Sequence, residues 1–207
     1  IGMSPFLMNL AACFIVIIIN QGLKKYGGDL AIGAFGIVNR LVFIVVMIVM
    51  GLNQGMQPIA GYNFGAKLYG RVNKVLKLTI IYATAVTTFG FLVGMLVPDL
   101  VVGIFTSDAE LTELSVTGLR ITVMFFPIIG FQMVTSNFFQ SIGMAGKAIF
   151  LSLTRQMLIL LPCLLILPQF FGVAGVWYSM PVSDLLASLI ALVMLVCQFR
   201  KFRTSPL

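Results

Sequence analysis

The sequence predicts an all-α polytopic membrane protein with six transmembrane helices. Of its 207 residues, 60% are hydrophobic and 9% are charged, whereas about 25% of the residues in an ordinary soluble domain are charged. Lipid can cover apolar surface that a soluble fold of this composition could not bury. Six apolar runs, each close to or longer than the roughly 20 residues that span a bilayer, occupy almost the whole chain.

The predicted helices cover approximately residues 3–22, 32–60, 73–97, 114–141, 147–168 and 174–199. Segments rich in glycine, proline or charge separate them. The second run would be about 43 Å long as a helix, so we expect it to be tilted, bent near Gly51–Pro58, or extended beyond the bilayer. Pro127, Pro162 and Pro181 predict bends in the last three helices, because proline lacks the backbone donor of a helix interior.

The basic residues predict how the chain is oriented. Only Lys24 and Lys25 fall in loops on one side, whereas nine of the thirteen basic residues fall on the other: Lys67, Arg71, Lys74, Lys77, Lys147, Arg155, Arg200, Lys201 and Arg203. Here Arg155 is assigned to the region of the fourth loop. Basic residues concentrate on the cytoplasmic side of membrane proteins, so both ends of the chain are predicted to be cytoplasmic. The net charge of +7 is then a topology signal, and no nucleic-acid partner is expected.

Catalytic and metal-binding chemistry is poorly represented. The chain has no histidine, and Cys13, Cys163 and Cys197 match no metal or redox spacing. We therefore expect no metal site, no cofactor and no enzymatic activity.

The end of the second helix has a distinctive order of residues, G-L-N-Q-G-M-Q-P-I-A-G-Y-N-F-G-A-K from residue 51. Pro58 predicts a kink there, and the amides of Asn53, Gln54 and Gln57 are expected to satisfy the backbone groups that the kink exposes. Gly51 and Gly55, earlier in the motif, are expected to let another helix approach closely, because small residues allow such contacts. Gly61, Asn63 and Gly65 are predicted to form the turn.

This motif resembles a sequence motif of the multidrug and toxic compound extrusion (MATE) family. More narrowly, it resembles the form of that motif in the family's bacterial members. Three further stretches are similar to family helices: the opening G-M-S-P-F-L to the start of the seventh, F-F-Q-S-I-G-M-A-G-K at 138–147 to the end of the tenth, and G-V-A-G-V-W-Y-S-M-P-V-S-D at 172–184 to the start of the twelfth. The resemblance covers essentially all of the chain but only the C-terminal half of a family member.

The resemblance implies that residues 1–207 form one six-helix lobe of a twelve-helix transporter whose N-terminal lobe is missing here. It further implies a location in the bacterial inner (plasma) membrane and secondary-active multidrug efflux by alternating access, with a proton or sodium ion as the coupling ion. The expected substrates are small organic molecules that are amphipathic or cationic. Two alternatives stay open: a flippase-like transporter of lipid-linked oligosaccharides, which should show more basic residues in its cleft, and a structural membrane module without transport.

Three charged residues fall inside the predicted helices: Arg40, Arg120 and Asp184. Counted along each helix, all three lie at similar depths of roughly 9–15 Å below the outer surface of the membrane. A charge at the bilayer centre costs at least about 2.5–3.5 kcal/mol on insertion scales, so each requires an explanation. Asp184 could form a structural ion pair with an arginine, bind the coupling ion, or line a vestibule together with the arginines. The stretches that resemble the seventh and tenth helices contain no acid, so coupling through the carboxylates that some members carry there is not expected.

Uncharged polar groups and aromatics at membrane depth suggest a cavity wall. Amides in such positions often bond helices to one another, and this alternative stays open for each of them. The candidate lining residues are Asn39, Gln54, Gln57, Gln132, Asn137 and Phe131.

Overall fold

The structure is a computed structural model that describes residues 3–204, with side chains for Phe6 and for residues 9–198. Within these residues the fold is entirely helical. The elements are α1 (Met3–Gly65), α2 (Tyr69–Leu96), α3 (Pro98–Gly103), α4 (Ala109–Val123), α5 (Phe126–Ser141), α6 (Ala145–Leu153), the π-helix η1 (Thr154–Leu160), α7 (Leu161–Phe171) and α8 (Val173–Thr204). The predicted all-α membrane fold is confirmed.

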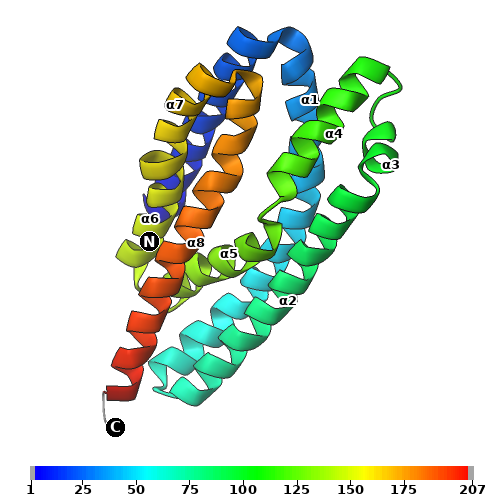
Figure 1. Ribbon diagram of the computed structural model, residues 1–207. Coiled ribbons are helices and arrows are strands. Elements are labelled where there is room, and N and C mark those ends of the chain that lie inside the picture. The colour runs from blue at the N-terminus through cyan, green and yellow to red at the C-terminus, as the bar shows by residue number, and fades with distance from the viewer. Residues whose placement is uncertain (1–2, 205–207) are drawn as a thin grey trace.

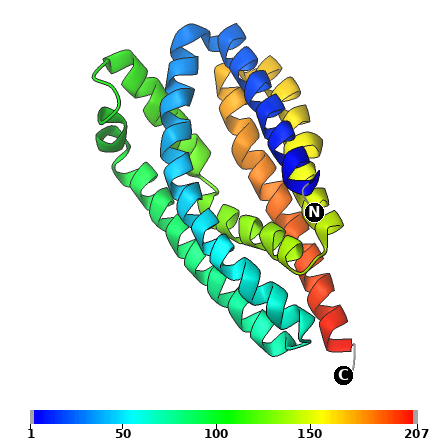
Figure 2. The same ribbon diagram turned by 180° about the vertical axis from the view of Figure 1, so that it is seen from behind.

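Helix α1 consists of two arms that fold back on one another at Gly28 (Figures 1 and 2). Gly28 has φ 68° and ψ −163° and is the one residue of α1 outside the helical region; glycine adopts this conformation without the penalty that a Cβ imposes. The second arm, residues 29–65, continues as a helix through Pro58. At 1.5 Å per residue it is about 55 Å long. This length exceeds the thickness of the bilayer core, so the arm must tilt or project from the core.

The fourth predicted span, 114–141, is a broken helix. Helices α4 and α5 meet at an angle of 55°, and the break at Met124–Phe125 comes just before Pro127 at the start of α5. Proline fits the first turn of a helix, where its missing N–H has no partner in any case. Counted by length and hydropathy, four helices of the described chain can span a membrane, or five with this bent pair. Because α1 is counted once although it has two arms, the arrangement agrees with the six predicted runs.

The fifth span is continuous from α6 to α7 but contains a π-helical segment. The backbone N–H of Leu161 bonds the carbonyl of Gln156, five residues earlier, at the end of η1. Pro162 follows at once and cannot donate to the carbonyl of Leu158 four residues before it. The wider π turn accommodates the proline ring and changes the directions of the side chains that precede it, a feature frequent at functional sites.

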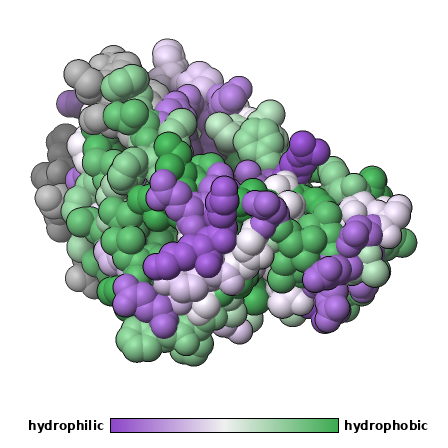
Figure 3. Space-filling view, turned by 90° about the horizontal axis from the view of Figure 1, so that it is seen from above, coloured by the Kyte–Doolittle hydropathy of each residue, from purple (hydrophilic) through white to green (hydrophobic). Residues whose placement is uncertain are grey.

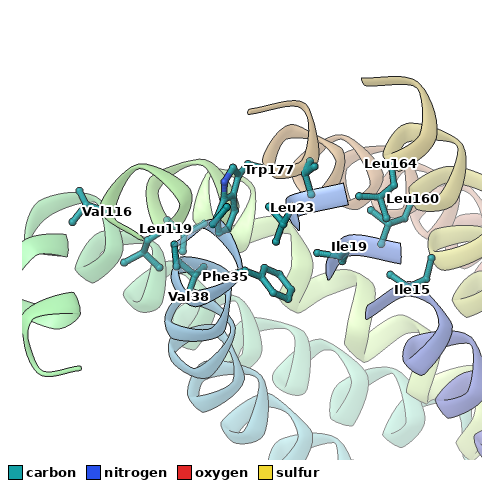
Figure 4. Close-up of a cluster of buried hydrophobic side chains, with 14 of the residues drawn as sticks. Ile15, Ile19, Leu23, Phe35, Val38, Val116, Leu119, Leu160, Leu164 and Trp177 are labelled. Carbon is teal, nitrogen blue, oxygen red and sulfur yellow. The ribbon is translucent and has the colours of Figure 1, made fainter. Parts of the chain in front are cut away.

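Two hydrophobic clusters hold the helices together. One contains Trp177, Phe35 and Leu119 (Figure 4). It also contains Leu23 and Ala31, which flank Gly28, and so lies toward the end of the molecule where α1 turns. The other contains Phe138, Phe139 and Met56 and lies toward the opposite end. Many large apolar side chains outside these clusters are exposed, as expected of a surface that lipid covers. Seen from above, hydrophilic residues gather across the middle of the Gly28 end, with hydrophobic surface beside them (Figure 3).

The motif at the end of α1 differs in detail from its predicted role. Lys67, with φ 57°, is the left-handed residue of the turn between α1 and α2, whereas Gly65 is the last residue of α1. Gly61 instead permits a close approach to α5, because a Cβ there would lie 2.9 Å from the carbonyl oxygen of Ser141. Asn63 is 8% exposed and its amide donates to the carbonyl of Ile59 at 2.8 Å.

A Cβ built at Gly51 or Gly55 meets nothing within 4 Å. Within the described chain no helix approaches these two glycines, so the expected close contact with a helix stays a prediction. The expectation for Asn53 is wrong. Asn53 is 2% exposed, and neither of its amide atoms has a hydrogen-bond partner there, so it does not satisfy backbone near Pro58.

Candidate functional site

A cavity of about 370 Å³, which we call the central cavity, lies among the helices, and some of its lining residues, such as Val16 and Phe43, are exposed. Both arms of α1 line it, together with α4, α5, η1 and α8. Its wall is mainly apolar, and its two charged residues are Arg155 and Asp184. The lining residues are Ala12, Val16, Ile19, Phe35, Val38, Asn39, Val42, Phe43, Val46, Thr122, Phe126, Ile129, Met133, Arg155, Leu160, Met180, Ser183 and Asp184.

Arg155 and Asp184 form the one ion pair found among the described residues. The Nε of Arg155 donates to Oδ1 of Asp184 at 2.7 Å. The carboxylate side chain is 6% exposed, whereas 32% of the arginine side chain is exposed. A buried carboxylate that lost this partner would leave an uncompensated charge, which is strongly destabilising. The pair therefore connects η1 to α8 at the cavity.

Local structure positions both partners. Arg155 is the second residue of the π-helix η1, and Asp184 lies near the middle of the long helix α8. Four residues along α8, the hydroxyl of Ser188 donates to the backbone carbonyl of Asp184 at 2.6 Å. The buried face of α8 also carries Ser179 and Ser183, so small polar side chains surround the carboxylate along its own helix.

The prediction that Asp184 pairs with Arg40 or Arg120 was wrong, because its partner is Arg155. Arg40 and Arg120 are both exposed, and neither lines the cavity. The assignment of Arg155 to a loop was also wrong, since it lies within the continuous span from α6 to α7. Arg155 falls eight residues inside the predicted run 147–168, so the depth argument applied to the other charges could have identified it.

The other sequence candidates are dispersed. Asn39 lies in the cavity wall, whereas Phe131 lines a separate apolar pocket of about 280 Å³ between α5 and α8. The remaining four amides lie outside the lining of the central cavity: Gln132 is buried, Asn137 donates to the carbonyl of Met133 at 2.9 Å, Gln54 is exposed and Gln57 is half-buried.

Metal coordination finds no support in the described part of the chain, where no three His, Cys, Asp or Glu side chains lie close enough to hold an ion. The cavity instead offers one ion pair, one amide, the hydroxyls of Thr122 and Ser183, and otherwise apolar walls. Such a site suits an amphipathic organic molecule, because ligand pockets are mostly apolar with a few fixed polar groups.

Comparison with known proteins agrees with this arrangement. Residues 5–166 match the MatE family model. Over 192 residues the chain is 30% identical to the multidrug export protein MepA of Staphylococcus aureus strain MSSA476, and the match covers 93% of this chain and 42% of MepA. A ligand-bound structure of the MATE multidrug transporter DinF-BH is 36% identical, with a TM-score of 0.86, and the match covers 99% of this chain and 46% of DinF-BH.

More distant structures share the fold. An outward-facing multidrug-resistance MATE transporter is 19% identical with a TM-score of 0.91, and the match again covers 99% of this chain and 46% of the other. The chain thus spans less than half the length of the relatives that it matches. With its family model, its helical arrangement and its membrane-spanning helices in agreement, this chain belongs to the MatE family of membrane transporters.

Proposed function

We propose that this chain is the C-terminal six-helix lobe of a secondary-active multidrug exporter and that the central cavity is part of its substrate path. The observation that carries the proposal is the Arg155–Asp184 pair in the wall of a cavity of about 370 Å³. Ionisable groups inside membrane segments are rare and concentrate along substrate and ion pathways. The similarity to MepA and to the multidrug transporter DinF-BH supports drug export as the activity.

The second lobe of the proposed transporter would pack on the exposed face of the second arm of α1. Gly51 and Gly55 are open on that arm, and Met47 and Tyr62 are 53% and 78% exposed. The two glycines are spaced four apart, as in the small-residue motifs at which membrane helices approach closely. We further propose that both ends of this chain are cytoplasmic, since the described loop around Lys67 and the start of α2 carry four exposed basic residues.

Asp184 is the candidate coupling group of this lobe. Transport would be driven by a proton or sodium gradient, and a carboxylate held by a single arginine can change its partner when an ion or substrate arrives. Substitution by asparagine keeps the shape of the side chain but removes its charge, and so separates this role from simple packing.

The test is efflux of the dye rhodamine 6G from proteoliposomes that contain the full-length transporter, under an imposed proton or sodium gradient. The proposal expects gradient-dependent efflux in one of the two conditions and its loss in Asp184→Asn. Asp99→Asn, at an exposed position at the start of α3, is the matched control and should export normally. Efflux by residues 1–207 alone would contradict the two-lobe proposal, and unchanged gradient dependence in Asp184→Asn would remove this residue from coupling.

A further inference from the structure

The more exposed of the two charged groups in the wall of the central cavity is a guanidinium. Asp184 is 6% exposed and already accepts the Nε–H of Arg155, whereas 32% of the arginine side chain is exposed. Both side chains line the cavity, and the guanidinium is the more exposed of the two. A ligand in the cavity therefore has more accessible surface of a positively charged hydrogen-bond donor than of the carboxylate.

Arg155 has hydrogen-bond donors that no described residue uses. Arginine has five N–H donors, and only the Nε–H is used by the described residues. Two other polar groups of the wall are engaged locally, since Thr122 donates to the carbonyl of Gly118 and Ser183 to that of Met180. The paired Nη donors of a guanidinium match the two oxygens of a carboxylate in a planar, bidentate arrangement.

The rest of the wall suits an apolar body. Met133 and Met180 lie in it with the aromatic side chains of Phe35, Phe43 and Phe126, and methionine adapts to ligands of different shape. A volume of about 370 Å³ lies at the small end of ligand pockets, so a body of one or two rings fits better than a large polycyclic one.

We propose that the cavity binds amphipathic organic carboxylates, with the acid group on the Nη atoms of Arg155 and the apolar body among the methionines and aromatics. The inference rests on the proposed export function and names a substrate class for the same cavity. It differs from the expectation of cationic substrates because Asp184 is already paired with Arg155 and is the less exposed of the two. The charge of Asp184 opposes that of the ligand, so its removal should strengthen binding of the acid.

The experiment uses two probes that differ in one charge, dansylglycine and dansylglycine methyl ester. Each is titrated by fluorescence against the full-length transporter in lipid nanodiscs, with empty nanodiscs as the blank. We expect the acid to bind at least about 10-fold more tightly than the ester, as a charge-assisted bidentate contact allows. In Asp184→Asn we expect this preference to increase.

Removal of the guanidinium needs a variant that folds. Arg155→Gln alone leaves the Asp184 charge unpaired, so the decisive variant is Arg155→Gln with Asp184→Asn, which removes both charges and keeps similar shapes. It should bind the acid and the ester within about 2-fold of one another. Arg71→Gln, an exposed arginine at the start of α2, should keep the wild-type preference.

Equal binding of the two probes to the wild type, or a preference for the acid that persists in the double variant, would overturn the proposal. Rhodamine 6G efflux is measured on the same wild-type preparation to separate the two levels of inference. Efflux without a preference for the acid refutes only the carboxylate site. Absence of efflux under both gradients refutes the export function, whatever the probes bind.

Discussion

The packing of Gly118 against Trp177 gives the most direct test of the described core. Gly118 lies on α4 and faces the indole of Trp177 on α8. A Cβ at position 118 would lie 2.6 Å from Cζ2 and Cη2 of the indole and 2.9 Å from Cε2. Carbon atoms are in favourable contact at about 3.5–4.0 Å, so the ring would have to retreat by about 1 Å in Gly118→Ala.

The ring has little room to retreat. Trp177 is 2% exposed, and its ring centroid lies 6.0 Å from that of Phe35 on α1 (Figure 4). Overpacking of a close-packed core costs about 1–3 kcal/mol, and we expect Gly118→Ala to destabilise the protein by this amount. For a domain of this size, each kcal/mol lowers the unfolding midpoint by about 2–4 °C. The midpoint is measured by heating the full-length transporter in detergent and following its soluble fraction.

Two further variants make the test specific. Gly36→Ala is the matched control, because a Cβ there meets nothing within 4 Å, and it should leave the midpoint unchanged or raise it slightly. Trp177→Phe removes the ring atoms that clash, and the Nε1 that it also removes has no hydrogen-bond partner among the described residues. The double variant Gly118→Ala/Trp177→Phe should therefore be more stable than the sum of the single effects predicts. A Gly118→Ala protein as stable as Gly36→Ala would refute this packing.

Three other substitutions probe the backbone and the ion pair through the same unfolding midpoint. Gly175→Ala should be more damaging than Gly118→Ala, because its Cβ would lie 2.4 Å from the carbonyl oxygen of Leu167, and backbone cannot rotate away as a side chain can; a midpoint equal to that of the wild type would contradict this. Arg155→Leu should destabilise by about 3–5 kcal/mol since it strands the buried carboxylate, and adding Asp184→Leu should restore much of the loss; a double variant no better than the single one would rule out the pair. Lys67→Gly should stabilise by up to about 1 kcal/mol, because Lys67 has φ 57° and glycine adopts this conformation freely; Lys67→Val should do the opposite, and equal midpoints for the two would argue against the turn.

Much of the fold was predictable because membrane-spanning helices can be recognised from the amino-acid composition of short segments. The six apolar runs agree with the observed helices apart from their ends, since a bilayer requires long continuous stretches whose backbone groups bond within the helix. Glycines and prolines also marked breaks correctly in several places, as at Gly28 and just before Pro127. The short helix α3 was not anticipated, because six residues give too little periodicity to recognise.

The candidate site was predictable only in part. Asp184 stood out because a carboxylate inside a membrane span is costly, but its partner could not be chosen by depth alone. Arg40 and Arg120 have suitable predicted depths and yet are exposed, whereas Arg155 is directed toward α8 from the π-helix that precedes Pro162. A one-residue change in helical register rotates a side chain by about 100°, and no pattern of hydrophobicity records it.

The sequence by itself determined the class of the protein: its composition required a membrane, and its apolar runs set the number of helices. The motif from Gly51 to Lys67 also indicated the family that the comparisons show. Only the tertiary structure decided which charges meet, which polar groups line the cavity, and that the guanidinium there is more exposed than the carboxylate. The physical reason is that the preference of each residue for lipid or water depends on its own side chain and can be inferred from the sequence. An ion pair instead depends on the relative rotation of two helices that are distant in sequence.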